Sequence, residues 1–178
     1  MQPVMVLGCV LQFVNKVLES CSERDMVMAL GKYIDTEIGR LYLAEENGFI
    51  VRLTADKAPE QDGLGESHLL QQAAAEVTEY LAGKRRIFTV PVKAEGTPFQ
   101  KTIWAALQRI PFGETRSYGE IAREVGCPKG ARAVGMACNR NPILLMIPCH
   151  RVVGSTGKLV GFACGLPMKE KLLHLEST

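Results

Sequence analysis

Alternating apolar and polar positions in the first third of the chain predict a β-hairpin. The two segments are residues 40–44 (RLYLA) and 49–53 (FIVRL), and they flank a polar stretch that ends in Asn47-Gly48. Asn-Gly between two such segments favours a tight turn, because both residues tolerate the positive φ values that the turn requires. The β-like composition begins at Tyr33, so sheet structure is expected in the first half of the chain.

A helix and a further strand are predicted after the hairpin. Residues 55–65 carry proline, glycine and charge, which is typical of a loop. Residues 69–82 place apolar side chains at helical spacing and are followed by Gly83, a residue suited to the position just past a helix end. Residues 87–92 are predicted as another strand. The first half is therefore a small α/β unit without an obvious catalytic constellation.

Two helix starts are recognisable in the second half from their capping residues. Residues 97–100 (TPFQ) offer Thr as the N-cap, Pro at the first helical position and Gln three residues after the cap. This helix is expected to run to about Ile110 and to end before Pro111. Residues 117–120 (SYGE) form a second capping box, which opens a short helix that stops at Gly126.

A third helix, predicted over residues 131–139, follows a tight turn at residues 127–130 (CPKG). A capped helix, a short turn with glycine and a second short helix indicate a helix-turn-helix, although a purely structural helical hairpin gives the same pattern. Arg132, at the start of the third helix, would be the side chain that reads or wedges DNA. Small side chains would let this helix approach either the core or a DNA groove closely; they are Ala131, Ala133, Gly135 and Ala137.

The distribution of charge says more about partners than the net charge of +2. Residues 96–178 hold 11 basic against 5 acidic side chains, a net +6, and residues 1–95 hold 10 against 14, a net −4. A basic half fits a DNA-binding domain, but a solvated face of mixed charge gives the same figures. A hydrophobic content of 47% is ample for a core. We expect two domains, 1–95 and 96–178.

Residues 1–25 are a possible N-terminal extension, within which residues 4–21 are compatible with a short helix that ends near Ser20. The apolar segment 4–10 lacks the flanks of a secretory signal and is too short to span a bilayer. The six cysteines show no C-x-x-C spacing, and the three histidines do not complete a zinc-finger pattern. A reducing, intracellular setting with free thiols, no metal and no membrane is the expectation.

The segment NPILLMIPCHRVVG carries the candidate chemistry. Its apolar run over residues 143–147 predicts burial and delivers Cys149 at its end. A buried cysteine is commonly no more than a small core residue. Here His150 and Arg151 follow at once, and a nearby cation, histidine or helix N-terminus turns a thiol into a nucleophile. Neighbours in a helix do not face each other, so His150 is expected to use a bridging water or a distant partner such as Glu176.

The sequence around the cysteine resembles the active-site signature of the O6-alkylguanine-DNA alkyltransferases, also called methylated-DNA–protein-cysteine methyltransferases. The signature is residues 148–153 (PCHRVV), and the resemblance runs in order over residues 96–176. It includes residues 97–100, 110–111, 113–115, 117–118, 131–135, 141–142 and 161–170. The implied fold is α+β: a small N-terminal α/β (ribonuclease-H-like) domain, then a mainly helical, winged-helix-like DNA-binding domain with the helix-turn-helix.

The resemblance implies direct reversal of DNA damage. Cys149 would take the alkyl group from O6-alkylguanine, and also from O4-alkylthymine, in one irreversible SN2 step without a cofactor. His150 would accept the thiol proton through a water, and Glu176 would complete the relay. Tyr118 would hydrogen-bond the departing guanine, and Asn141 would brace the turn that carries the site. A thioether is a poor leaving group, so each molecule would act once.

The resemblance also implies a mode of DNA binding. A monomer would bind the minor groove of double-stranded DNA and rotate the damaged guanine out of the stack. Arg132 would fill the gap and Tyr118 would help drive the rotation, with further DNA contacts from Ala131, Gly135 and Cys138. The implied location is the cytoplasm, or the nucleus in a eukaryote. The base pocket would be lined by Val152, Leu159, Gly161, Phe162, Ala163, Cys164 and Lys169.

Three pocket positions depart from the commoner pattern of the family. Phe162 stands where Tyr is usual, which keeps a flat face but loses a hydroxyl. Ala163 stands where Ser is common, so a side-chain contact to the guanine oxygen is lost while a backbone N–H can still reach it. Cys164 occupies a rim position of variable size, and its volume suggests intermediate tolerance of large alkyl groups.

Three other functions share part of this pattern. A catalytically inert binder of alkylated DNA with the same fold lacks the nucleophile, which is present here as Cys149. A helix-turn-helix regulator with a redox-sensing or structural Cys149 leaves the apolar run and the match at Glu176 unexplained. A cysteine hydrolase needs an oxyanion site, and none is recognisable in the sequence.

Overall fold

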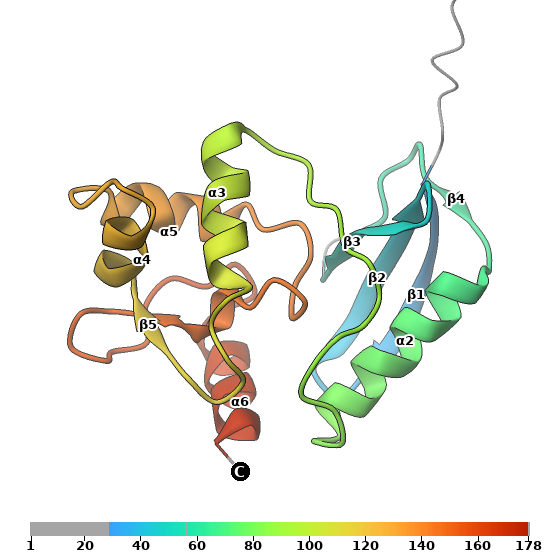
Figure 1. Ribbon diagram of the computed structural model, residues 1–178. Helices are drawn as coiled ribbons and strands as arrows, with labels where there is room; N and C mark the ends of the chain where they lie inside the picture. Colours follow the sequence, from blue (N-terminus) through green and yellow to red (C-terminus); the bar gives the residue numbers. More distant parts are fainter. Residues whose placement is uncertain (1–28, 56, 178) are drawn as a thin grey trace, which may run out of the picture.

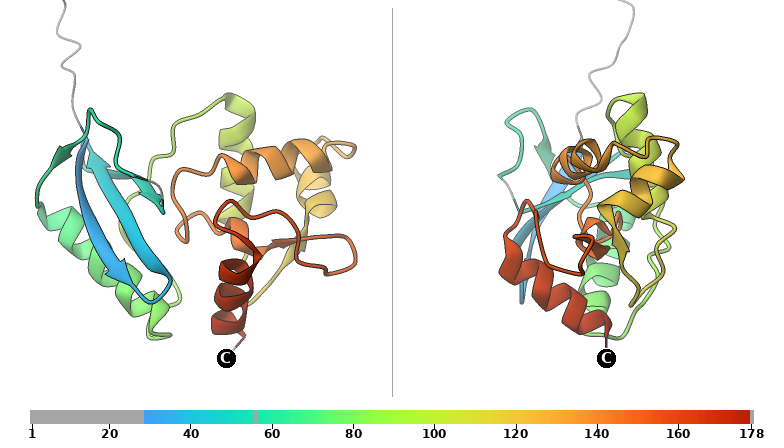
Figure 2. Two further views of the ribbon diagram at one scale, coloured as in Figure 1. Left: turned by 180° about the vertical axis from the view of Figure 1, so that it is seen from behind. Right: turned by 90° about the vertical axis from the view of Figure 1, so that its left-hand side faces the viewer.

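The computed structural model describes residues 29–55 and 57–177, so the possible extension 1–25 and its short helix lie outside the described residues. Figures 1 and 2 show two halves side by side. The N-terminal half contains β1 (Leu30–Thr36), β2 (Gly39–Glu46), β3 (Phe49–Thr54), β4 (Gly63–Leu64) and α2 (His68–Leu81). The C-terminal half contains α3 (Pro98–Leu107), β5 (Arg116–Ser117), α4 (Tyr118–Glu124), α5 (Ala131–Asn139), the 3₁₀ helix η1 (Cys149–Arg151), β6 (Val152–Val153) and α6 (Leu166–Glu176).

The N-terminal half is a mixed sheet with α2 along one face (Figure 1). The strand order is β3-β2-β1-β4, in which β1, β2 and β3 are antiparallel and β4 is parallel to β1. The predicted hairpin is confirmed, because Asn47 and Gly48 adopt positive φ values of 51° and 78° between β2 and β3. The predicted helix is confirmed as α2, which is followed by Gly83 at a φ of 71°.

The strand predicted over residues 87–92 is wrong. Only its last residue forms an isolated bridge, to β3. The buried carboxylate of Glu76 in α2 accepts the backbone N–H groups of Thr89 (2.8 Å) and Val90 (3.4 Å), and Pro91 has no N–H to donate. A buried carboxylate has to be satisfied by donors, so a side chain takes the backbone groups that a strand would need.

The helices of the C-terminal half begin where their caps predict. α3 and α4 both start with complete capping boxes. α3 ends at Leu107 and not near Ile110, because the N–H of Ile110 bonds the carbonyl of Leu107 in a tighter turn and Pro111 cannot continue the helix. α4, a turn closed by the N–H of Gly130 on the carbonyl of Cys127 (2.7 Å), and α5 form the predicted helix-turn-helix arrangement.

The edge strand β3 holds the segment that leads to Cys149. The N–H of Leu53 donates to the carbonyl of Pro142 (2.9 Å), and the N–H of Leu144 donates to the carbonyl of Leu53 (2.8 Å). Buried side chains from both halves form one continuous hydrophobic core. Backbone hydrogen bonds and core packing therefore fix the position of this segment against the sheet.

Glu76→Ala should destabilise the fold by about 2–3 kcal/mol, because the buried N–H groups of residues 89–90 lose their acceptor. Chemical denaturation of the variant and the wild-type protein measures the difference. The control is Glu79→Ala on the same helix, which breaks a more exposed ion pair with Arg85 worth at most about 1 kcal/mol. Equal losses in the two variants would contradict this role of Glu76.

Candidate active site

Cys149 begins η1 and is buried, with 3% of its surface exposed. The apolar run 143–147 that delivers it is buried throughout, as predicted. The run turns at Leu145, which has a positive φ of 66°, and the N–H of Cys149 then donates to the carbonyl of Ile147 (2.8 Å). A positive φ is costly in a residue with a branched side chain, so the surrounding packing holds this loop in place.

Asn141 spans the loop that carries Cys149. Its amide nitrogen donates to the carbonyl of Ile147 (2.8 Å) and to the sulfur of Cys149 (3.2 Å). Its amide oxygen accepts from the N–H of Ile143 (3.0 Å). One side chain therefore ties both ends of the apolar run together and also contacts the thiol.

The thiol of Cys149 is protonated at rest. Burial raises its pKa to about 11, and the hydrogen bond from Asn141 and the charge of Lys169 only partly oppose this. The expectation that Arg151 stabilises the thiolate as an adjacent cation is wrong, because its guanidinium binds Glu176 and a backbone carbonyl. A base has to take the thiol proton before Cys149 can act as a nucleophile.

His150, which follows Cys149 in the chain, forms a buried pair with Glu176. Nε2 of His150 lies 2.9 Å from Oε1 of Glu176. Because an ionised carboxylate can only accept, Nε2 carries the proton and Nδ1 presents a lone pair. Within residues 29–55 and 57–177, no hydrogen-bond partner lies near Nδ1. Burial lowers the pKa of His150, so the imidazole is neutral and can accept a proton.

Glu176 receives hydrogen bonds from several segments. Besides His150, it accepts from Nε and Nη2 of Arg151 (2.9 and 2.8 Å), from the N–H of Gly113 (3.1 Å) and from the hydroxyl of Tyr80. Burial alone would raise the pKa of this carboxyl, but the hydrogen bonds from His150 and Arg151 lower it to about 2. Glu176 is therefore a carboxylate at neutral pH and orients the imidazole.

Sequence reasoning misses two partners of Glu176 and misplaces a third. Tyr80 and Gly113 are separated from Glu176 by 96 and 63 residues, and no local pattern links them to it. Arg151 stands within the signature, but its partner cannot be read from its neighbours. The contact of Tyr80 exists only because the two halves of the chain pack together, and those of Gly113 and Arg151 depend on the folding of the C-terminal half.

Tyr118 and Lys169 hold the loop that follows β6. The hydroxyl of Tyr118, at the start of α4, lies 3.0 Å from the carbonyl oxygens of both Val160 and Gly161. Lys169 is fully buried and donates to the carbonyls of Val152 and Val160, and more weakly to Gly161. Its ammonium lies 5.7 Å from the centre of the Tyr118 ring. Several residues expected at the base pocket thus form one connected wall.

The remaining residues expected at the pocket lie on the same loop or just after it. Phe162 and Cys164 are partly buried and pack against the core. Leu159 is half-buried and Ala163 is exposed. The loop therefore has an inner side that continues the core and an outer side in contact with solvent.

The residues expected to contact DNA lie along α5. Ala131, Gly135 and Cys138 share one face, and Arg132 is exposed in the first turn. A Cβ on Gly135 would lie 3.7 Å from the ring of Tyr118, so a small residue suits this crossing of α4 and α5. Cys138 is buried, and burial raises its pKa to about 12. We therefore assign Cys138 to the interior and not to the surface that meets DNA.

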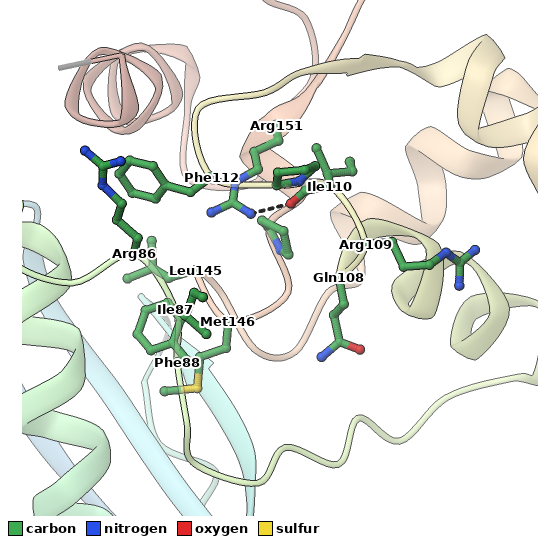
Figure 3. Close-up of a pocket in the computed structure, with 12 residues that line it drawn as sticks. Arg86, Ile87, Phe88, Gln108, Arg109, Ile110, Phe112, Leu145, Met146 and Arg151 are labelled. Carbon is green, nitrogen blue, oxygen red and sulfur yellow. Dashed lines mark hydrogen bonds between the residues drawn. The ribbon is translucent and has the colours of Figure 1, made fainter.

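A cavity of about 570 Å³ lies between the two halves, beside η1 (Figure 3). Pro148 and Arg151 line it, but Cys149 and His150 do not, so a ligand there would not reach the thiol. Figure 3 shows the guanidinium of Arg151 directed at the carbonyl of Ile110 (2.6 Å). The other lining residues are Arg86, Ile87, Phe88, Gln108, Arg109, Pro111, Phe112, Leu145 and Met146.

Residues 29–55 and 57–177 contain no group of three or more His, Cys, Asp or Glu side chains placed to hold a metal ion. No helix in these ranges has the length and apolar character needed to cross a membrane. The cysteines in these ranges are not in disulfides: Cys127, Cys138, Cys149 and Cys164.

Comparison with known proteins relates both halves to one family. The family "6-O-methylguanine DNA methyltransferase" matches through its DNA binding domain over residues 98–178 and through its ribonuclease-like domain over residues 30–94. The methylated-DNA–protein-cysteine methyltransferase of Methanosarcina barkeri is 45% identical over 148 residues, which cover 80% of this chain and 94% of that protein. The protein of the same name from Mycobacterium leprae is 44% identical over 147 residues, with coverages of 80% and 89%.

The fold has a solved counterpart as well. The crystal structure of Mycobacterium tuberculosis OGT in complex with DNA matches with a TM-score of 0.79 and 40% identity, over 83% of this chain and 92% of that one. Fold and sequence together define an α+β protein in which a ribonuclease-like domain precedes a helical DNA-binding domain. The chain belongs to the 6-O-methylguanine DNA methyltransferase family, which confirms the resemblance and the predicted fold class.

The stability that Glu176 contributes should depend on pH. Its folded-state pKa of about 2 lies below the ordinary 4.5, so the contribution is full above about pH 4.5 and is lost as the pH falls toward 2. Glu176→Gln should cost roughly 3 kcal/mol at neutral pH, where Arg151 loses its charged partner, and less at about pH 3.

Urea denaturation of Glu176→Gln and of the wild-type protein, at pH values from 3 to 7, measures the difference in their free energies of unfolding. Glu170→Gln, an exposed change on the same helix, is the control. A loss of stability in Glu176→Gln that is the same at every pH would contradict this account of the carboxylate.

Proposed function

We propose that this protein repairs alkylated DNA directly, by moving the alkyl group of O6-alkylguanine onto Cys149 once per molecule. It is a methylated-DNA–protein-cysteine methyltransferase, the activity named for relatives that match over most of its length. The observation that carries the proposal is a buried thiol next to a base, His150, that Glu176 orients. The M. tuberculosis relative was crystallised in complex with DNA, which supports a duplex as the partner.

Activation begins with the thiol proton. The raised pKa of Cys149 means that little thiolate is present at neutral pH. The lone pair on Nδ1 of His150 is the acceptor, and a water bridges it to the sulfur. Glu176 supports the positive charge that then develops on the imidazole. Asn141 donates to the sulfur and steadies the thiolate as it forms.

The transfer exchanges one covalent bond for another. The sulfur of Cys149 attacks the alkyl carbon, the S–C bond forms as the C–O6 bond breaks, and the bonding electrons leave with guanine. Tyr118 hydrogen-bonds the departing base, and the proton taken up by His150 neutralises it. The thioether product is not displaced under cellular conditions, so the protein is consumed and requires no cofactor.

The damaged base has to leave the duplex to reach this thiol. Cys149 is buried, and an alkylated O6 cannot be reached within a base stack. Arg132, exposed in the first turn of α5, fills the gap that the base leaves. The small residues Ala131 and Gly135 permit close approach to the minor groove. Tyr118 lies where α5 meets the pocket wall and helps to drive the rotation.

The loop between β6 and α6 forms the base pocket. Because the thiol is only 3% exposed, this loop has to shift to admit the base. Lys169 fixes its inner side through backbone carbonyls. The flat face of Phe162 stacks on the guanine, and O4-alkylthymine is a second substrate with the same exocyclic leaving oxygen. The lining residues are Val152, Leu159, Gly161, Phe162, Ala163, Cys164 and Lys169.

The same proposal covers the organisation of the protein. The two domains divide between residues 95 and 96, in the segment that precedes α3. The protein acts as a monomer, since a single chain supplies the thiol, its base and the helix-turn-helix. Its place is the cytoplasm, or the nucleus of a eukaryotic cell, where damaged DNA is found.

Incubation with a duplex that contains one O6-methylguanine should add one methyl group to the protein. Intact-mass measurement should show the gain saturating at one equivalent, and peptide mapping should place it on Cys149. Cys149→Ser, which keeps the size and removes the soft nucleophile, is the control. Repeated turnover would contradict the single-use mechanism, and binding of the duplex without a mass gain would favour the inert binder.

Arg132→Ala should slow repair of the duplex by roughly 30- to 100-fold, because about 2–3 kcal/mol of support for the extruded base is lost. Transfer from O6-methylguanine supplied as the free base should hardly change. Single-turnover rates on the two substrates measure this. Arg140→Ala at the end of the same helix controls for the loss of one positive charge. Equal losses on both substrates would remove Arg132 from base extrusion.

A further inference from the structure

Tyr80 brings a hydroxyl group from the N-terminal half into the site. It lies in the last turn of α2 and is fully buried. Its hydroxyl donates to Oε1 of Glu176 and lies 3.2 Å from Nε2 of His150. Tyr80 therefore contacts both members of the pair that activates the thiol.

The hydrogen bonds among Tyr80, Glu176 and His150 determine which atom carries each proton. Glu176 is ionised and can only accept, so the single proton of the Tyr80 hydroxyl points to the carboxylate. The remaining lone pairs of that hydroxyl face Nε2 of His150. Nε2 therefore lies between two acceptors and has to carry a hydrogen. This leaves Nδ1 as the basic nitrogen, which is the nitrogen without a partner among the described residues.

Aromatic packing fixes the position of this hydroxyl. The ring of Phe88 lies 5.0 Å from that of Tyr80 in a tilted contact, and the ring of Phe112 lies 6.0 Å away, edge to face. Phe88 follows α2 and Phe112 follows α3, so both halves of the chain hold the tyrosine. Burial and the nearby carboxylate raise the pKa of Tyr80, so its hydroxyl stays protonated.

The other charged and titratable groups around His150 do not duplicate this contact. Glu176 and Lys169 face it from α6, and Arg151 faces it from η1. The two cations oppose protonation of the imidazole, and the carboxylate favours it. Of these groups, only Tyr80 offers a neutral acceptor to Nε2 while reducing the charge on the carboxylate.

We propose that Tyr80 is a positioning residue for alkyl transfer, through which the N-terminal domain orients the His150–Glu176 pair and limits the charge on its carboxylate. This inference rests on the proposed function. It gives the N-terminal domain a direct part in the reaction: docking of α2 against η1 and α6 completes the base that activates Cys149.

Tyr80→Phe tests the inference, because it removes the hydroxyl and keeps the aromatic packing. Single-turnover transfer from an O6-methylguanine duplex should slow by about tenfold, since the imidazole loses part of its orientation. The lower limb of the pH–rate profile should move to higher pH, because Glu176 regains charge and holds a proton on His150 more strongly. The stoichiometry should stay at one alkyl group per protein, with duplex affinity unchanged.

Tyr42→Phe is the matched control. Tyr42 is equally buried in the same domain, and its hydroxyl donates to a carboxylate, Asp62, at 2.9 Å. Its loss should lower stability in the same way but leave the transfer rate and the pH profile unchanged. A purely structural role for Tyr80 predicts that the two variants behave alike, and that result would overturn the inference.

A spectroscopic measurement tests the same point without DNA. In protein labelled with a nitrogen isotope at histidine, the neutral His150 ring should hold its proton on Nε2, and in Tyr80→Phe the ring should become protonated at a higher pH than in the wild-type protein. An unchanged titration of His150 together with an unchanged pH–rate profile would contradict the inference alone. Failure of the wild-type protein to accept any alkyl group would contradict the proposed function and, with it, this inference.

Discussion

The carboxylate of Glu176 joins segments that are far apart in the chain at the place where the thiol lies. A charge buried in the protein interior is costly unless an opposite charge and hydrogen bonds compensate it. Arg151 supplies the charge, and His150, Gly113 and Tyr80 supply hydrogen bonds. These partners come from η1, from the turn after α3 and from α2. The need to satisfy one ionised group thus brings three segments of the C-terminal half together at the site, and Tyr80 adds a contact from the N-terminal half.

The same carboxylate explains how a neutral imidazole can be both oriented and basic. Alone, a carboxylate at 2.9 Å would favour the imidazolium form and leave no acceptor for the proton of Cys149. Arg151 shares Glu176 and opposes protonation of His150, as burial does. Hydrogen bonds therefore fix the orientation of the His150 ring, while burial and the nearby Arg151 keep the ring neutral. Burial thus keeps both groups neutral at rest, since it raises the pKa of the Cys149 thiol and lowers that of the His150 imidazole.

Features that depend on neighbours along the chain are predictable from the sequence, and those that depend on distant contacts are not. The turn at residues 47–48 and both capping boxes are local, and they are found where the pattern indicates. The error over residues 87–92 arises because a glutamate of α2 takes the strand's donors. Family resemblance supplies most of the site, yet Tyr80 contacts it only through the folded domain interface. Helical spacing alone could have placed Cys138 inside, on the same face as the buried Val134.

Burial of Cys149 also determines what this thiol does not react with. Peroxides and soluble electrophiles attack thiols according to their thiolate content and accessibility. A pKa of about 11 and an exposure of 3% leave little of either. Among the described residues, Cys127 is more exposed to such reagents than Cys149. If Cys149 is used only once, as proposed, its burial also protects it from oxidation and stray alkylation before a damaged base reaches it.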